Sequence, residues 1–151
     1  LPLIAAGGIA TGRAMLAAMV LGADGVQIGT RFAASLEASG HSKFKNKIIS
    51  LSEGDTKLAM KKLVPVRLIK NKFFNKIHDA ESKGASKEEL TKLLGHARAK
   101  QGMFEGDMEE GELEIGQVAA LINEIKPASE IIESLINELN IAKAEIGQLE
   151  L

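Results

Sequence analysis

The sequence predicts an α/β fold, because two short apolar strands are joined by one helix-length segment. We expect strands at Leu3–Ala6 and Val26–Ile28, with a helix over Gly12–Leu21 between them. Thr11 is a suitable N-cap for this helix, and Gly22 is a suitable terminator. A strand, a helix and a second strand in this order form a compact, right-handed parallel crossover.

Glycines at the ends of both strands predict a phosphate-binding site. Gly7 and Gly8 follow the first strand, and Gly29 follows the second. Without a Cβ the backbone can come close to a ligand, and its N–H groups, with the first turn of the next helix, suit a phosphate. In a (β/α)₈ barrel such a site commonly follows strands seven and eight. The two strands are therefore expected to be the last two of a barrel; a tight turn without a ligand is the alternative.

The length of the chain fits only part of such a barrel. The sequence has 151 residues and begins within the first predicted strand, whereas a complete barrel needs about 250 residues. We expect the C-terminal part of a longer polypeptide. Residues 1–36 would form the last two β/α units, and residues 37–151 a helical region that packs on the barrel.

The region after the strands is expected to be entirely helical. A capping box, Ser86 with Glu89, supports one of its helices. The predicted helices cover Ser42–Leu51, Leu68–Lys83, Ser86–Ala97, Ile115–Lys126 and a long final segment from about Ser129. The final helix carries an apolar seam, which would pack within the subunit or form a homodimer contact: Ile132, Leu135, Leu139, Ala142, Ile146 and Leu149.

Charge is distributed unevenly along the chain, although the formal net charge is only −1. Residues 41–100 contain 15 Lys and Arg against 6 Asp and Glu, a balance of +9, whereas residues 101–151 contain 2 against 12, a balance of −10. Either the acidic segment neutralises the basic one, or a basic surface attracts a phosphorylated cofactor or an acidic carrier protein. The absence of Tyr and Trp argues against nucleic-acid binding.

Other site chemistries find little support. The sequence has no Cys and no long apolar run, so we expect no thiolate catalysis and no membrane span, and a cytoplasmic location. His41, His78 and His96 are too dispersed for a local metal site: His41 is expected to be a cap, and the other two to face solvent. The acidic residues from Asp107 to Glu114 are expected to form a solvated loop.

Three segments resemble the nitronate monooxygenase family, which includes the former 2-nitropropane dioxygenases and the flavin-dependent enoyl-ACP reductase II enzymes. The segments are Ala5–Arg13, Leu21–Phe32 and Glu112–Gln117, and the run Gly-Val-Gln-Ile-Gly-Thr-Arg-Phe within the second is the most specific. A fourth segment, Arg98–Asp107, is most similar to the reductase branch.

The resemblance implies an FMN-dependent oxidoreductase with NADH or NADPH as electron donor. The enzyme would reduce an enoyl thioester, either carried by acyl carrier protein or as a small molecule. The first alternative is a monooxygenase that oxidises nitronates with O₂. The second is a barrel that binds a phosphate ligand without redox chemistry. FMN would be held by Gly7, Gly8, Gln27, Ile28, Gly29 and Thr30, and Gln117 would line the substrate pocket. The family's catalytic histidine lies in a Gly-Gly-His motif that these 151 residues lack, so we assign no catalytic residue.

Overall fold

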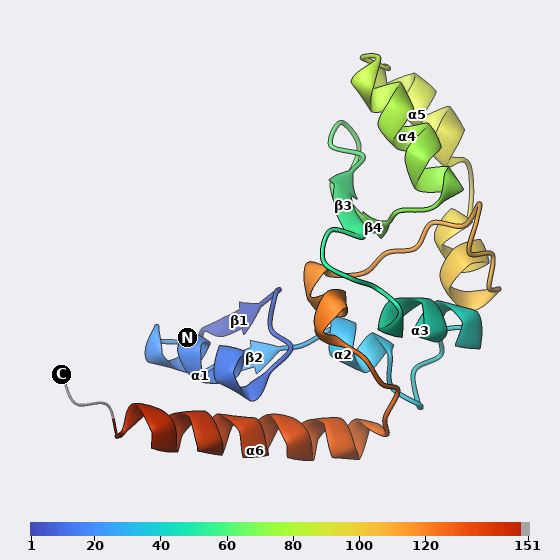
Figure 1. The fold of residues 1–151 in the computed structure, drawn as a ribbon. Helices are drawn as coiled ribbons and strands as arrows, with labels where there is room; N and C mark the ends of the chain where they lie inside the picture. Colours follow the sequence, from blue (N-terminus) through green and yellow to red (C-terminus); the bar gives the residue numbers. More distant parts are fainter. Residues whose placement is uncertain (149–151) are drawn as a thin grey trace. The chain divides into compact units, whose positions relative to one another are not determined.

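The computed structural model describes residues 1–148, which form two compact units (Figure 1). The first unit combines residues 1–38 with 124–148, and the second contains residues 39–123. The expected boundary after residue 36 lies close to the end of the first segment, but the last helix belongs with the strands. The first unit consists of β1 (Ile4–Ala6), α1 (Gly12–Val20), β2 (Gly25–Gln27), α2 (Thr30–Ala33) and α6 (Ala128–Ile146).

The two strands of the first unit form the expected parallel pair. Ile4 lies opposite Gly25, and Ala6 lies opposite Gln27. The Thr11 hydroxyl accepts a hydrogen bond from the Ala14 N–H at 3.1 Å, which confirms the predicted N-cap. A strand of a parallel barrel is normally buried on both faces, but Ile4 on β1 is 52% exposed. Within residues 1–148, β1 pairs only with β2, so no other strand of this part of the chain covers it.

Helix α6 runs beside α1 and supplies much of the core of the first unit (Figure 1). Ile131 and Leu135 are buried against Ile9 and Met15. The predicted final helix is confirmed, but its buried face differs from the predicted apolar seam. Leu135 and Ala142 of that seam are buried, whereas Ile132 and Ile146 are about half exposed. Leu149, the last position of the predicted seam, lies outside the described residues.

The second unit contains helices and an antiparallel β-hairpin. Its core is formed by Ala59, Met60, Leu68, Phe73, Phe74 and Ile77. Its elements are α3 (Ser42–Ile49), β3 (Thr56–Ala59), β4 (Val66–Ile69), α4 (Lys72–Ser82), α5 (Lys87–Leu94), the π-helical turn η1 (Lys100–Phe104) and the 3₁₀ turn η2 (Gln117–Leu121).

The prediction of an entirely helical region after the strands is wrong at this hairpin. Leu68 and Ile69, expected in a helix, lie on β4, where Ile69 pairs with Thr56. The helix begins only after Asn71, whose Oδ1 accepts a hydrogen bond from the Phe74 N–H at 2.9 Å. The same side chain donates to the Met108 and Gly111 carbonyls. The cap therefore fixes both the start of α4 and a loop far away in sequence.

The prediction of a helix over Ile115–Lys126 is also wrong. The Ile69 N–H donates to the Leu113 carbonyl, and the Ile115 N–H donates to the Arg67 carbonyl, so this segment runs extended beside β4. Only the short turn η2 follows. The predicted helices at α3 and α5 are confirmed, including the capping box of Ser86 with Glu89, although α5 ends at Leu94 rather than continuing to Ala97. None of the helices within residues 1–148 is long and apolar enough to cross a membrane.

Candidate functional site

The parallel pairing brings the ends of β1 and β2 to one edge of the first unit. Since Ala6 lies opposite Gln27, Gly7 and Gly8 leave the pair at the same edge as the segment that contains Gly29. Gly7 and Gly8 have φ values of +85° and +71°, a region that residues with a Cβ rarely adopt. The backbone of this turn therefore requires glycine whether or not a ligand binds.

Space beside these glycines is open. A Cβ built on Gly7, Gly8 or Gly29 would have no atom within 4 Å, leaving aside the residues directly bonded to each glycine. Gly29 precedes α2 and has a φ of −99°, so unlike the other two it could carry a side chain without backbone strain. The three glycines expose their backbone along an edge that a bound phosphate could approach.

The other predicted cofactor residues differ in where their side chains lie. Gln27, the last residue of β2, is exposed, and Thr30 is the first residue of α2. Ile28 lines an apolar hollow of about 190 Å³ together with Val26 and Phe32. Its side chain therefore belongs to the packing of the first unit, and only its backbone is suited to a phosphate.

One N–H group at the N-terminus of α1 is bound within the chain. The Gly12 N–H donates a hydrogen bond of 2.7 Å to Oε2 of Glu138 on α6. A carboxylate is favoured at this position, because the first turn of a helix carries unpaired N–H groups and a partial positive charge. An incoming phosphate would have to compete with Glu138 for this N–H.

Arg31 supports the same edge from α2. Its Nη1 donates to the Ala10 carbonyl at 2.7 Å and lies 3.8 Å from Oε1 of Glu138. These contacts connect the segment after β1 to α2 and α6. The sequence showed Arg31 only as part of a motif, and its role in positioning the turn became apparent from the fold.

The histidines occupy structural or surface positions. His41 is the N-cap of α3: its Nδ1 accepts a hydrogen bond from the Lys43 N–H at 3.1 Å, which confirms the predicted cap. His96 is exposed, as expected. His78 is not simply solvated, because it is partly buried and stacks on Phe74 with ring centres 5.5 Å apart. Among residues 1–148, no group of three or more His, Cys, Asp or Glu side chains could hold a metal ion.

The acidic loop is more ordered than the sequence suggested. Glu109 lies 3.1 Å from Nζ of Lys72, and Glu110 lies 2.7 Å from Nζ of Lys76. The Asp107 carboxylate accepts hydrogen bonds from backbone N–H groups, of which that of Glu110 has the largest effect, and these bonds lower the pKa of Asp107. Glu112 is buried, and this burial, with the nearby charge of Glu114, raises its pKa to about 7. The expectation of a solvated loop is therefore wrong for Glu112.

Gln117 belongs to the second unit, where it is the exposed first residue of η2. The preceding Gly116 has extended backbone, with φ −70° and ψ 159°. The position of Gln117 shows a side chain available to a ligand, and its role in a substrate pocket stays a prediction.

Comparison with known proteins identifies the family. The family model described as nitronate monooxygenase matches residues 1–138. A probable nitronate monooxygenase of Staphylococcus aureus strain MSSA476 is 36% identical over 146 residues, which are 93% of this chain and 39% of that protein. The chain belongs to the nitronate monooxygenase family, and it spans about two fifths of the length of the curated relatives it matches.

Solved structures agree with this assignment. FabK from Thermotoga maritima superposes with a TM-score of 0.89 at 40% identity, covering 97% of this chain and 46% of FabK. A nitroalkane oxidase from Streptomyces ansochromogenes gives a TM-score of 0.74 at 30% identity, covering 97% of this chain and 41% of the oxidase. The chain therefore has the α/β fold of these neighbours over part of their length.

Proposed function

We propose that this chain supplies the FMN-phosphate cradle of an enoyl-ACP reductase II, an enzyme that uses NADH or NADPH to reduce enoyl thioesters. The observation that carries the proposal is the shared edge of β1 and β2, where Gly7, Gly8 and Gly29 expose open backbone. The similarity to FabK at 40% identity supports the same activity. The two strands would be the seventh and eighth of a (β/α)₈ barrel within a longer polypeptide.

The residues at this edge fit a phosphate. N–H groups of Gly8 and Gly29 would donate to its oxygens, and the Thr30 hydroxyl and Gln27 amide would bind at the rim. The backbone of Ile28 and the turn at Gly7 would complete the cradle. When bound, FMN would supply the transfer of electrons from the nicotinamide to the acceptor, while the protein positions it.

Oxidation of a nitronate with O₂ is the alternative reaction, because the family model and the S. aureus relative are both described as nitronate monooxygenase. We favour the enoyl thioester on two grounds. Identity to FabK is higher than to the nitroalkane oxidase, at 40% against 30%. In addition, Arg98–Asp107 resembles the reductase branch. Gln117 would line the substrate pocket in either case, and the catalytic residue would come from outside these 151 residues.

One experiment on the native polypeptide that carries this sequence separates the possibilities. The purified protein should be yellow, and its NADH or NADPH oxidation should be stimulated by crotonyl-CoA much more than by a nitroalkane. Consumption of O₂ with a nitronate in the absence of NADH and NADPH, without stimulation by crotonyl-CoA, would overturn the reductase in favour of the monooxygenase. A colourless protein without redox activity that still binds inorganic phosphate would indicate a non-redox barrel.

A further inference from the structure

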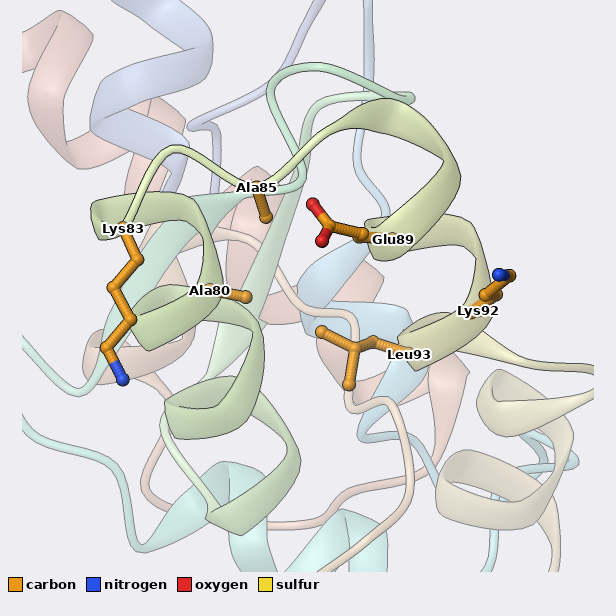
Figure 2. Close-up of a pocket in the computed structure, with 6 residues that line it drawn as sticks. All are labelled: Ala80, Lys83, Ala85, Glu89, Lys92 and Leu93. Atoms are coloured by element: carbon orange, nitrogen blue, oxygen red, sulfur yellow. The ribbon is translucent and has the colours of Figure 1, made fainter.

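Polar side chains do not converge in the hollow between α4 and α5, which measures about 420 Å³ (Figure 2). Its apolar side chains point into the gap between the helices, whereas Lys83 and Lys92 extend away from it. Glu89 is engaged in the capping box with Ser86. In the first unit, by contrast, an arginine and a glutamate from two different helices meet at the segment between β1 and α1. This pair lies next to the proposed phosphate cradle and bears on how the cradle is built.

Arg31 joins the two turns that form the proposed cradle. It lies two residues after Gly29, and its Nη1 donates a hydrogen bond of 2.7 Å to the carbonyl of Ala10, which lies two residues after Gly8. The Arg31 side chain is only 17% exposed, and Ala10 is buried. This hydrogen bond runs from the segment after one strand to the segment after the other, so a single side chain sets the spacing of the two turns.

Glu138 on α6 holds the same segment and the arginine at once. Its Oε2 accepts a hydrogen bond of 2.7 Å from the Gly12 N–H, and its Oε1 lies 3.8 Å from Nη1 of Arg31. The close packing of α1 on α6 brings the carboxylate to this place, since a Cβ built on Gly12 would lie 2.6 Å from Cβ of Glu138. One side chain therefore links α6, the N-terminus of α1 and α2.

The glycines of the cradle benefit from such a restraint. Gly7 and Gly8 have positive φ values, and glycine has more conformational freedom to lose than any other residue. A phosphate binds more tightly when the N–H groups already point toward it, because ordering them during binding reduces the affinity. Arg31 and Glu138 provide this order and leave the space beside the glycines open, since no atom lies within 4 Å of a Cβ built on Gly8 or Gly29.

Two effects of Glu138 on a bound phosphate oppose each other. As an anion it repels the phosphate, whereas as a hydrogen-bond and ion-pair partner it holds the turns in place. The contacts favour the second effect, because the carboxylate is already matched by the guanidinium of Arg31 and by the partial positive charge at the N-terminus of α1. Its charge is thus compensated within the chain, while its two contacts still fix the backbone.

We infer that Arg31 and Glu138 form a clamp that sets the spacing of the two phosphate-binding turns before FMN binds. Both are positioning residues, and neither is assigned a contact with FMN. This inference rests on the proposed function, because it concerns the cradle that would hold the FMN phosphate. Riboflavin has no phosphate, so its binding should not depend on the clamp.

The test uses the native polypeptide freed of FMN, with three variants on α6. Glu138→Gln keeps an acceptor for the Gly12 N–H but loses the ion pair with Arg31, whereas Glu138→Ala loses both contacts. Glu145→Ala is the matched control, because it removes a carboxylate of the same helix whose ion-pair partner, Arg13 on α1, is exposed. The Kd values of FMN and of riboflavin are measured by flavin fluorescence, and the melting temperature reports on folding.

We expect the Kd of FMN to rise about threefold in Glu138→Gln, which loses one ion pair, and about tenfold in Glu138→Ala. The Kd of riboflavin should be unchanged in both, and both Kd values should be unchanged in Glu145→Ala. The graded loss is diagnostic, because the two substitutions at Glu138 remove the same negative charge. A carboxylate that merely repels the phosphate would give the opposite result, with FMN bound more tightly in both variants.

Unchanged or tighter binding of FMN in Glu138→Ala would overturn the clamp, and so would an equal loss for riboflavin or in Glu145→Ala. If Glu138→Ala does not fold, Glu138→Gln decides the matter by the sign of its effect on FMN. These outcomes leave the proposed function intact. A native polypeptide that binds FMN no more tightly than riboflavin would contradict the proposed phosphate cradle and the clamp together.

Discussion

Glu112 shows how one buried carboxyl makes stability depend on pH. Burial raises its pKa from 4.5 to about 7, with a further contribution from the charge of Glu114, and Arg98 offsets part of the shift. Folding therefore favours the protonated form. The contribution of this proton is fully present below about pH 4.5, declines as the pH rises through about 7 and is lost above it.

Glu112→Gln should remove this dependence. Between about pH 5 and pH 8, the native protein should lose roughly 2 kcal/mol more unfolding free energy than the variant, measured by urea denaturation. Glu114→Gln is the matched control, because it removes only the smaller charge contribution and should keep most of the slope. The same pH slope in the native protein and in Glu112→Gln would contradict this account.

Gly29 allows the phosphate site to be tested without disturbing the fold. Gly29→Val places a branched side chain in open space at a φ of −99°, so the protein should fold. If FMN binds there, the side chain occupies the space of the phosphate and removes charge-assisted hydrogen bonds. We expect the affinity for FMN to fall by about tenfold or more, measured by flavin fluorescence of the native polypeptide.

The control for Gly29→Val is Glu109→Ala. The Glu109 side chain is 64% exposed, and within residues 1–148 its only ion pair is with an exposed lysine, Lys72, so its removal should leave flavin occupancy unchanged. A surface pair of this kind contributes about 1 kcal/mol or less to stability. Equal flavin occupancy in the two variants would show that the phosphate lies elsewhere.

At the scale of elements, local signals in the sequence predicted helix starts well. Thr11 and Ser86 both act as N-caps, as their hydroxyl groups and the following helical patterns indicated. The parallel pairing of β1 and β2 followed from the helix-length segment that joins the two apolar runs. These features depend on neighbouring residues, so the sequence alone contains the information.

The predictions from sequence were wrong where contacts between residues far apart in the chain determine the structure. Ile69 has a spacing that suits one helical face with Phe73 and Ile77, yet it pairs with Thr56 in the hairpin, and its N–H donates to the Leu113 carbonyl. Apolar periodicity cannot distinguish a buried strand from the first turn of a helix. In the same way, the contact of Glu138 with the N-terminus of α1 joins residues 126 positions apart, and no local pattern indicates it.

The packing of α1 on α6 depends on Gly12. A Cβ at this position would lie 2.2 Å from the Leu135 carbonyl oxygen and 2.3 Å from the Leu139 nitrogen, both backbone atoms that cannot easily move. Gly12→Ala should therefore lower the free energy of unfolding by about 2–3 kcal/mol, measured by urea denaturation. Gly147→Ala is the matched control, since its Cβ would meet atoms at an ordinary 3.5 Å and should have little effect. Equal stability of the two variants would show that the helices do not pack this closely.

At the scale of the whole molecule, the sheet of the first unit has fewer strands than the barrel proposed to hold FMN. Among the described residues, β1 and β2 form a two-stranded parallel sheet, and FabK, which shares the fold, is covered over 46% of its length. Leu3 is 60% exposed, Leu21 is 87% exposed, and Ile28 lies beside an apolar hollow. These apolar side chains and strand edges are suited to contacts with further strands and helices of a barrel.

The 151 residues expressed alone should therefore not retain FMN. A phosphate cradle at the ends of two strands keeps its geometry only if neighbouring strands hold them, and an exposed parallel edge favours association. Size-exclusion chromatography with light scattering should show oligomers or aggregates, and equilibrium dialysis should show less than stoichiometric flavin. The native polypeptide, treated identically, is the control and should bind FMN. A monomeric, cooperatively unfolding 151-residue protein with one FMN per chain would contradict the proposal that the cradle depends on a complete barrel.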